Sequence, residues 1–144
     1  MSYASMGRAP GGRRAVRAYA AIDLETKVMG ASPERLITLL FDGALAAIAQ
    51  AKLHLQQGDV AARGAAISKA IDIVDSGLKA SVDREAGGEV ATHLVAAYEL
   101  ISYYLLQANM NADSTKLDMA AQVLGTLGEA WRTANDPQPQ VAAV

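Results

Sequence analysis

The sequence predicts an all-α protein, an antiparallel four-helix bundle preceded by a short N-terminal arm or helix. Apolar residues recur at alternating steps of three and four through most of the chain, which is the spacing of an amphipathic helix. No stretch shows the strict apolar–polar alternation between turn residues that predicts a strand. Apolar residues make up 51% of the 144 residues, enough to fill a core. Short connections between the predicted helices favour antiparallel neighbours.

Both ends of the chain are predicted to be flexible tails. Residues 1–22 contain four arginines, no acidic residue and several Gly and Pro residues, a composition typical of a solvated segment. We therefore expect a basic tail over residues 1–18, the bundle over 19–135, and a second tail over 136–144 after Asp136-Pro137. Residues 19–30 are ambiguous between a short helix and an extended arm. Four arginines without interleaved aromatic residues, and a net charge of −2, argue against nucleic-acid binding.

The first predicted helix begins at Ser32-Pro33 and ends at Gly58. Serine caps exposed backbone N–H groups, and proline is already shaped for the first helical turn. Glycine is typical of helix ends, and Asp59 can cap the next helix. Between them runs an apolar stripe of Ile37, Phe41, Ala44, Ile48, Ala51 and Leu55.

Three more helices are predicted from similar stripes. The second stripe comprises Val60, Gly64, Ile67, Ile71, Val74, Leu78 and Val82. Gly87-Gly88 interrupts the chain, and the third stripe comprises Val90, Leu94, Ala97, Ile101, Tyr104 and Ala108. A polar turn over residues 109–113 precedes the fourth, which comprises Leu117, Ala120, Leu124, Leu127 and Trp131.

The sequence contains few groups that suggest catalysis or metal binding. Cysteine is absent, which excludes disulfides and thiolate chemistry. Asp72 and Asp75 are one turn apart, but they are expected to flank the core in contact with water rather than act as buried acid and base. Glu89 and His93 are separated by one residue more than the Glu-x-x-His spacing of di-iron bundles. We therefore predict no enzymatic activity, no cofactor and no metal.

No membrane span or secretory signal is expected. No run of about 18 apolar residues lacks a charge, and the arginines near the N-terminus are not followed by an apolar segment. The absence of cysteine fits a cytoplasmic protein but does not establish one.

Several predicted helices carry apolar residues outside their main stripe. Examples are Leu39 and Leu40 in the first helix, Ile73 in the second, and Tyr98 and Leu105 in the third. A small bundle buries one broad face of each helix. The surplus predicts either a groove that binds an amphipathic segment of a partner or a thicker core with a homodimer interface. Composition alone leaves both open.

The sequence resembles the FliS family, the flagellin-specific chaperones of flagellar export. The resemblance runs from about residue 15 to 134 and keeps the order and spacing of its parts throughout. Those parts are Ala18-Tyr19 with Ile22 and Asp23, Ala31 to Ile37, Leu39 to Leu45, Gln57 to Val60, Ser68 to Ala80, Gly87 to Leu94, Leu105 to Asp113, and Glu129 to Trp131. Relatives often have glutamine and valine after the N-terminal tyrosine, where this chain has Ala20, Ala21 and Ile22.

The resemblance implies a cytoplasmic bundle that binds the disordered C-terminal segment of newly made flagellin. Such binding prevents premature polymerisation and keeps flagellin competent for type III export. The family also implies contacts with a component of the export gate and, in some bacteria, with an anti-sigma factor; neither maps onto residues here.

The resemblance also suggests partner-binding residues. In the family, the N-terminal segment and its tyrosine can lie over the flagellin-binding surface of the free protein. This implies partner-binding roles for Tyr19 and its neighbours Val16 and Ile22. Apolar positions of the second helix are further candidates, although each fits the core better than a groove: Ile67, Ile71, Val74 and Leu78.

The alternative to an export chaperone is a helical homo-oligomeric structural or adaptor protein without a folding client.

Overall fold

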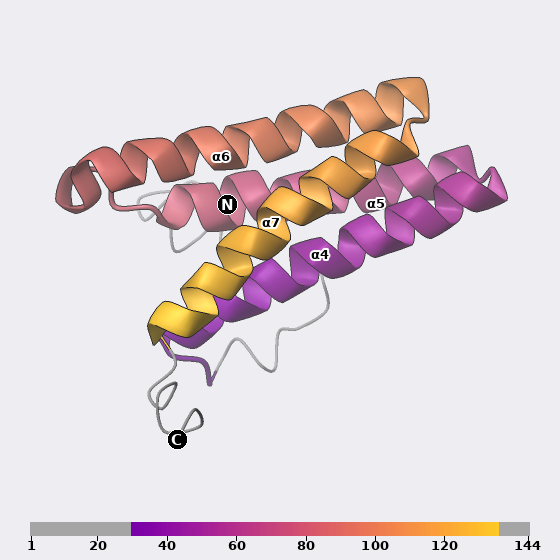
Figure 1. Cartoon of the computed structure of the whole chain (residues 1–144). Helices are drawn as coiled ribbons and strands as arrows, with labels where there is room; N and C mark the ends of the chain where they lie inside the picture. Colours follow the sequence, from indigo (N-terminus) through magenta and orange to yellow (C-terminus); the bar gives the residue numbers. More distant parts are fainter. Residues whose placement is uncertain (1–29, 136–144) are drawn as a thin grey trace, which may run out of the picture.

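The computed structural model describes residues 30–135, and they form a bundle of four long helical segments (Figure 1). The first is α4 (Pro33–Gln57). The second is α5 (Val60–Asp72), which continues as the π-helix η1 (Ile73–Leu78) and the 3-10 turn η2 (Lys79–Ser81). The others are α6 (Arg84–Asn111) and α7 (Ser114–Asn135). No β-strand occurs within residues 30–135, so the predicted all-α bundle is confirmed.

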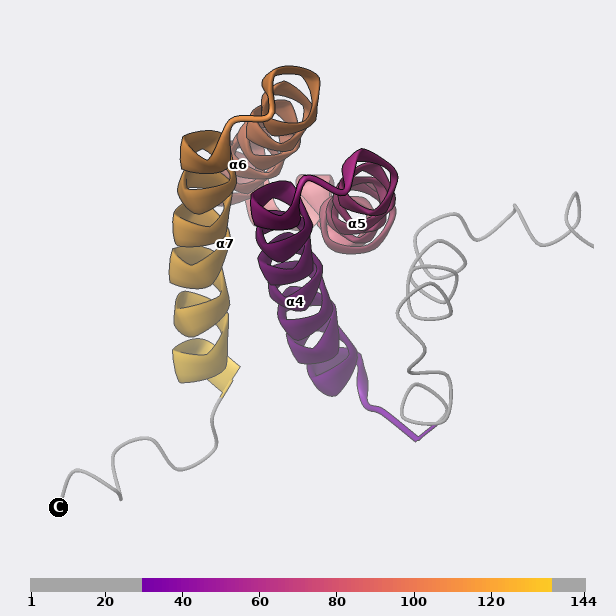
Figure 2. The same ribbon diagram turned by 90° about the vertical axis from the view of Figure 1, so that its right-hand side faces the viewer.

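The chain turns back after each segment, and α7 crosses in front of α5 in this view (Figure 1). α4 lies between α5 and α7 (Figure 2). The predicted limits 1–18, 19–135 and 136–144 involve ends that lie outside the described residues, so these limits stay predictions.

The ends of α4 follow the local chemistry of the sequence. The Ser32 hydroxyl accepts a hydrogen bond of 3.1 Å from the Arg35 N–H, and Pro33 occupies the first turn. Gly58 ends the helix in the left-handed conformation, with φ 75°. Asp59 then caps α5 by accepting from the Ala62 N–H at 3.0 Å. The predicted boundaries of this helix are therefore confirmed.

The second helical segment departs from the single regular helix that its stripe predicts. The Lys79 N–H donates to the Val74 carbonyl, five residues earlier, which is the hydrogen bond of a π-helix. Beside this wider turn, the Ser102 hydroxyl of α6 donates to the Asp75 carboxylate at 2.8 Å. Lys79 lies between the carboxylates of Asp75 and Glu99, at 3.9 and 3.7 Å. Asp75 is thus part of a polar link between η1 and α6.

The start of α6 also differs from the prediction. We expected the helix to begin after Gly87-Gly88, but it begins at Arg84, where the Asp83 carboxylate accepts from the Ala86 N–H at 3.0 Å. Gly88 has φ 55° and ψ −129°, so it separates this first turn from the rest of α6. The kink lies where the glycines predicted it. The helix starts earlier than predicted, because Asp83, four residues before Gly87, caps its first turn.

α7 is held against α4 along its whole length. Lys52 pairs with Asp118 at 2.8 Å near one end, and Arg132 pairs with Asp42 near the other. Such exposed ion pairs contribute only about 0–1 kcal/mol each. The closer contact is at Gly128, which is buried against the Phe41 ring. Helices that approach this closely need a small residue at the contact.

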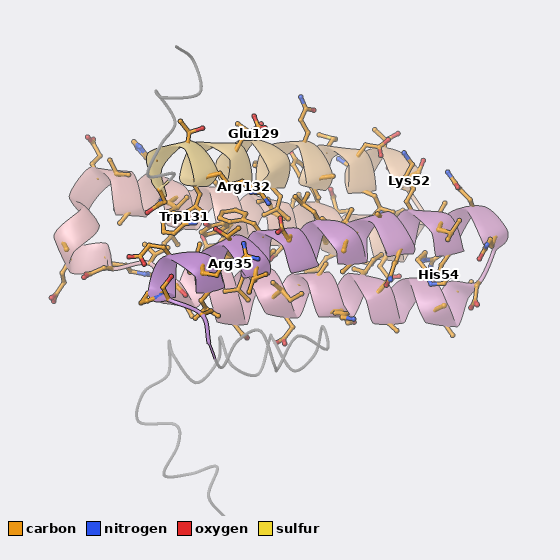
Figure 3. The ribbon with its side chains drawn as sticks, turned by 90° about the horizontal axis from the view of Figure 1, so that it is seen from below. Arg35, Lys52, His54, Glu129, Trp131 and Arg132 are labelled. Atoms are coloured by element: carbon orange, nitrogen blue, oxygen red, sulfur yellow. The ribbon has the colours of Figure 1, made fainter. Side chains whose placement is uncertain are left out.

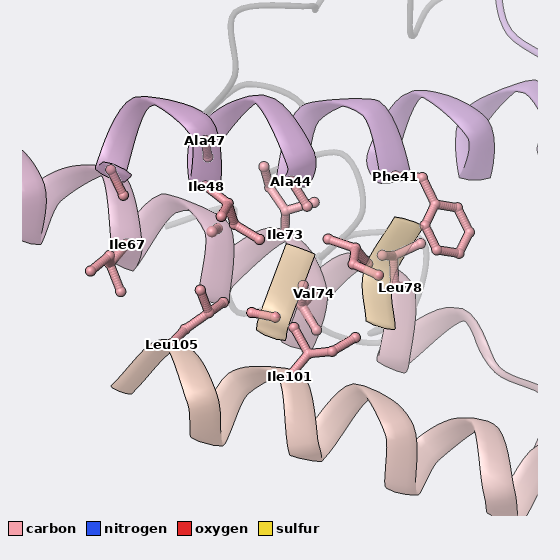
Figure 4. Packing of buried hydrophobic residues seen from close by; sticks show 14 of the residues in the cluster. Phe41, Ala44, Ala47, Ile48, Ile67, Ile73, Val74, Leu78, Ile101 and Leu105 are labelled. Atoms are coloured by element: carbon pink, nitrogen blue, oxygen red, sulfur yellow. The ribbon is translucent and has the colours of Figure 1, made fainter. Parts of the chain in front are cut away.

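The core runs between all four helical segments, and Figure 4 shows part of it. Its largest fully buried side chains come from each of them: Leu40, Ile67, Ile73, Val74, Leu78, Ile101, Leu105, Leu117 and Leu124. At about 1.5–3 kcal/mol for each buried large aliphatic side chain, this core is the main stabilising contribution.

The core absorbs much of the apolar surplus that the sequence suggested would lie outside it. Leu39, Leu40, Ile73, Tyr98 and Leu105 are all buried. Conversely, Val90, which the third stripe placed with the core, is 74% exposed. Most of the third stripe is nevertheless confirmed, because Ile101 and Ala108 are buried and Leu94 and Tyr104 pack against the core. The buried side of α6 also includes Tyr98 and Leu105.

Candidate binding groove

An apolar groove opens at one end of the bundle, where parts of all four helical segments meet. It has a volume of about 400 Å³, and we call it the end groove. Trp131, labelled in Figure 3, lies at this end of the molecule, and His54 lies at the other. The groove is lined by Ile37, Leu78, Ser81, Val82, Asp83, Ala86, Gly87, Val90, Ala91, Leu94, Tyr98 and Trp131.

The floor of the end groove is rigid. Leu78, Ala91 and Tyr98 are buried there, and the Tyr98 ring lies 6.4 Å from the Phe41 ring, measured between centroids. On the α7 side, the Trp131 indole N–H donates to the Thr38 hydroxyl at 3.1 Å, which fixes the ring. A surface that is already ordered loses little conformational entropy when a partner binds.

The polar side chains around the groove are mostly engaged in local structure. Asp83 caps α6, and the Ser81 hydroxyl donates to the Gly77 carbonyl. The Tyr98 hydroxyl is neutral at physiological pH, because its ordinary pKa of 10.0 is already high and burial raises the pKa further. The groove is therefore suited to apolar side chains rather than to a charged ligand.

A second apolar surface lies on the outside of α6. Four large side chains are exposed there at helical spacing, and we call this surface the α6 outer face: Leu100, Tyr103, Leu106 and Met110. It is separate from the groove, because none of these four residues lines the groove. An exposed row of this kind is typical of an interaction surface.

The predicted partner-binding residues fall into three groups: core residues, one groove residue, and residues outside the described part of the chain. Ile67 and Val74 are buried in the core, and Ile71 is partly buried against it. Leu78 is the one of the four that also lines the end groove. Val16, Tyr19 and Ile22 lie outside the described residues. A role in partner binding stays a prediction for all seven.

Sequence reasoning did not single out Ile37, Leu94, Tyr98 or Trp131 as binding residues, although they line the groove. The sequence identified each of them only as part of an apolar stripe or as an apolar residue outside the main stripes. Trp131 carried the best available signal, because a lone tryptophan near the end of an amphipathic helix is a large side chain that is seldom fully enclosed.

The candidate catalytic and metal-binding residues are not brought together. Asp72 is exposed, whereas Asp75 is engaged with Ser102 and Lys79. His93 is exposed on α6 and His54 is partly buried on α4. Within residues 30–135, no cluster of three or more His, Cys, Asp or Glu side chains could hold a metal ion.

By length and composition, α4 could also cross a membrane. This is weak evidence, because the core helix of a soluble protein has the same properties, and α4 contributes many buried residues to the core. The expected absence of a membrane span stays a prediction.

The chain matches known proteins over most of its length. The family model described as "Flagellar protein FliS" matches residues 15–138. The flagellar secretion chaperone FliS of Salmonella typhimurium is 48% identical over 117 residues, which cover 81% of this chain and 87% of that protein. The Escherichia coli protein of the same name is 36% identical and covers 83% and 88%. The flagellar secretion chaperone FliSB of Pseudomonas aeruginosa is 35% identical and covers 82% and 93%. This chain therefore belongs to the FliS family.

Proposed function

We propose that this protein is a cytoplasmic flagellar export chaperone whose end groove binds the C-terminal segment of flagellin. The observation that carries the proposal is an apolar groove with a rigid floor on a bundle of the FliS family. Relatives at up to 48% identity over most of the chain are named flagellar secretion chaperones, which favours a chaperone over an adaptor without a client. Family membership also implies a non-enzymatic role.

The groove has the properties that a disordered client requires. A segment that folds on binding loses chain entropy, so the surface must offer substantial apolar burial. Each Leu, Ile or Val that a partner buries contributes roughly 1.5–3 kcal/mol, and several such anchors offset the ordering. The groove floor of Leu78, Ala91 and Tyr98 is already in place, so the ordering cost falls on the client alone.

The α6 outer face gives the same client a second place to bind. A groove of about 400 Å³ accommodates only a few side chains of a long segment. An amphipathic helix could cover Leu100, Tyr103 and Met110, which are three and seven residues apart. We propose that flagellin uses both surfaces, which would keep its polymerising segment from other flagellin molecules and in a state that the export apparatus can accept.

The N-terminal residues Val16, Tyr19 and Ile22 are proposed to regulate access to the groove. The described chain begins at Gly30, just before α4, whose first turns include Ile37 of the groove. Gly30 lies eleven positions after Tyr19, and a chain of that length spans about 35 Å when extended. Tyr19 is therefore within reach of the groove, and Tyr19→Ala should change flagellin affinity while leaving helicity and melting nearly unchanged.

The groove is tested by two matched valine substitutions. Val90 lies on the rim of the groove and is 74% exposed, whereas Val60, 63% exposed, begins α5 beyond the far end of α4. About 30 Å of helix separates these ends of the bundle. Val90→Glu should weaken binding of a C-terminal flagellin peptide at least about tenfold, because a charge would enter an apolar interface. Val60→Glu should leave the affinity unchanged.

Titration calorimetry gives the decisive measurement. We expect one-to-one binding with a strongly negative heat-capacity change, which reports burial of apolar surface. An absence of binding by the unmodified protein at micromolar concentrations would refute the chaperone proposal. Equal effects of the two substitutions would place the client elsewhere. Light scattering on the same samples would detect a homodimer that occupies the apolar surface instead.

A further inference from the structure

We propose that the Tyr98 hydroxyl is a specificity-determining anchor, which hydrogen-bonds one polar side chain of the client segment in the end groove. The inference rests on the proposed function, because it concerns what the same groove selects. It predicts that the bound segment is not uniformly apolar, and that a hydroxyl or amide side chain faces the groove floor.

The Tyr98 hydroxyl stands out among the polar groups of the groove lining. The Trp131 indole donates to Thr38, the Ser81 hydroxyl to Gly77, and the Asp83 carboxylate accepts from Ala86. Tyr98 makes no hydrogen bond to any residue within 30–135, although only 3% of its surface is exposed. Its closest aromatic neighbour, Phe41, offers no hydrogen-bonding group.

The hydroxyl is not sealed inside the protein. The fully enclosed side-chain polar atoms that lack a partner within the described residues are His54 Nδ1 and Gln107 Oε1. The Tyr98 oxygen is not one of them, so it keeps a small opening. Because Tyr98 is among the residues that line the end groove, we take its hydroxyl to open into the groove.

A client that fills the groove would therefore cover this hydroxyl. A purely apolar side chain would leave a buried O–H without a partner, and such a group opposes binding. A side-chain amide or hydroxyl would accept from it or donate to it. Selection against wholly apolar segments would help a chaperone to distinguish its client from other exposed hydrophobic sequences.

The test combines Tyr98→Phe with a control on the same helix. Tyr104 is partly buried, does not line the groove, and makes no hydrogen bond through its hydroxyl to any described residue. Tyr98→Phe should reduce the affinity for a synthetic peptide of the flagellin C-terminal segment about three- to tenfold, the effect of one hydrogen bond. Tyr104→Phe should change it less than about twofold. Circular dichroism should show unchanged helicity for both.

Substitutions in the peptide identify the partner of Tyr98. Each polar residue of the peptide is replaced in turn by alanine, and binding is measured to the unmodified protein and to Tyr98→Phe. One replacement should weaken binding to the unmodified protein by a similar factor and have little effect with Tyr98→Phe, the result expected of a coupled pair.

The outcomes separate the inference from the proposed function. If the unmodified protein binds the peptide, but Tyr98→Phe binds equally well and no peptide replacement is coupled to it, the inference is overturned and the proposed function stands. If the unmodified protein does not bind the peptide, both are overturned. Should Tyr98→Phe fail to fold, the peptide replacements alone decide: the inference fails if none weakens binding to the unmodified protein more than about twofold.

Discussion

Gly128 determines how closely α7 approaches α4. A Cβ atom added at this position would lie 3.3 Å from Cδ1 of the Phe41 ring, whereas one added at Gly125, a turn earlier, would meet nothing within 4 Å. Phe41 is itself buried and contacts Tyr98, so it cannot move freely. The two glycines thus occupy the same helix in opposite environments.

This contrast predicts opposite effects of one substitution. Gly128→Ala should lower the free energy of unfolding by about 1–3 kcal/mol, because the added methyl group overpacks a tight contact. Gly125→Ala should raise it by up to about 1 kcal/mol, since alanine is the better helix former. Urea denaturation measures both. A stabilising Gly128→Ala would mean that Phe41 has room to give way, contrary to the packing described.

The side chains of the groove could be predicted only in part. Local sequence spacing identifies residues that lie on one face of a helix, but it does not identify the helix that covers them. Tyr98 was placed in the apolar surplus, yet it is buried beside the Phe41 ring of α4 and lines the groove together with Leu78 of η1. Its role depends on contacts between segments far apart in the sequence.

The C-terminus of α6 shows a backbone conformation that its residue does not favour. Ala112 ends the helix with φ 49° and ψ 49°, the left-handed region, and its N–H donates to the Ala108 carbonyl. Glycine is the usual residue at such a position because its lack of a Cβ removes the steric cost. Gly58 fills the corresponding position after α4.

Ala112→Gly should therefore stabilise the protein by about 1 kcal/mol. The matched control is Ala96→Gly, at an exposed position within the same helix, which should destabilise by about 0.5–1 kcal/mol. Thermal melting followed by circular dichroism distinguishes the two by the sign of the change in Tm. If both substitutions lowered the Tm, the left-handed conformation of Ala112 would not be what limits this helix end.

Helix boundaries were predictable where one residue type dominates the local energy. Ser32-Pro33 and Gly58-Asp59 act through backbone groups within one turn, so the sequence alone identifies them. The π-helical turn of η1 was not predictable, because its extra residue per turn depends on packing against α4 and α6. The stripe of α6 was predicted correctly at Ile101 and Ala108 but not at Val90, because apolar residues of this helix occupy several overlapping rows.

The amino-acid composition predicted an excess of apolar residues, but not where in the molecule they lie. The excess of apolar residues indicated that some would remain outside the core, and the structure divides them between core, groove and α6 outer face. Leu39 and Ile73 belong to the first, Leu94 to the second, and Met110 to the third. Which apolar residues become buried depends on contacts between all four helical segments. The pattern of one segment alone therefore does not predict where its apolar residues lie.

The four helical segments together form one core, which predicts that residues 30–135 fold without the two ends of the chain. Leu40, Ile73, Ile101 and Leu124 are fully buried and come one from each segment. A fragment of residues 30–135 should therefore unfold in a single cooperative transition, with a Tm within about 4 °C of the full chain, a shift equivalent to less than about 1 kcal/mol for a domain of this size. Calorimetry and circular dichroism should report coincident transitions.

The same fragment tests whether the N-terminal segment competes with the client. If residues 1–29 occupy the end groove in the free protein, their removal should raise the affinity for the flagellin peptide, because the client no longer has to displace them. Val90→Glu should weaken binding to the fragment by at least the factor seen in the full chain. A fragment that melts normally but binds the peptide no more tightly would exclude competition for the groove, and a fragment that melts without cooperativity would show that the core requires the ends of the chain.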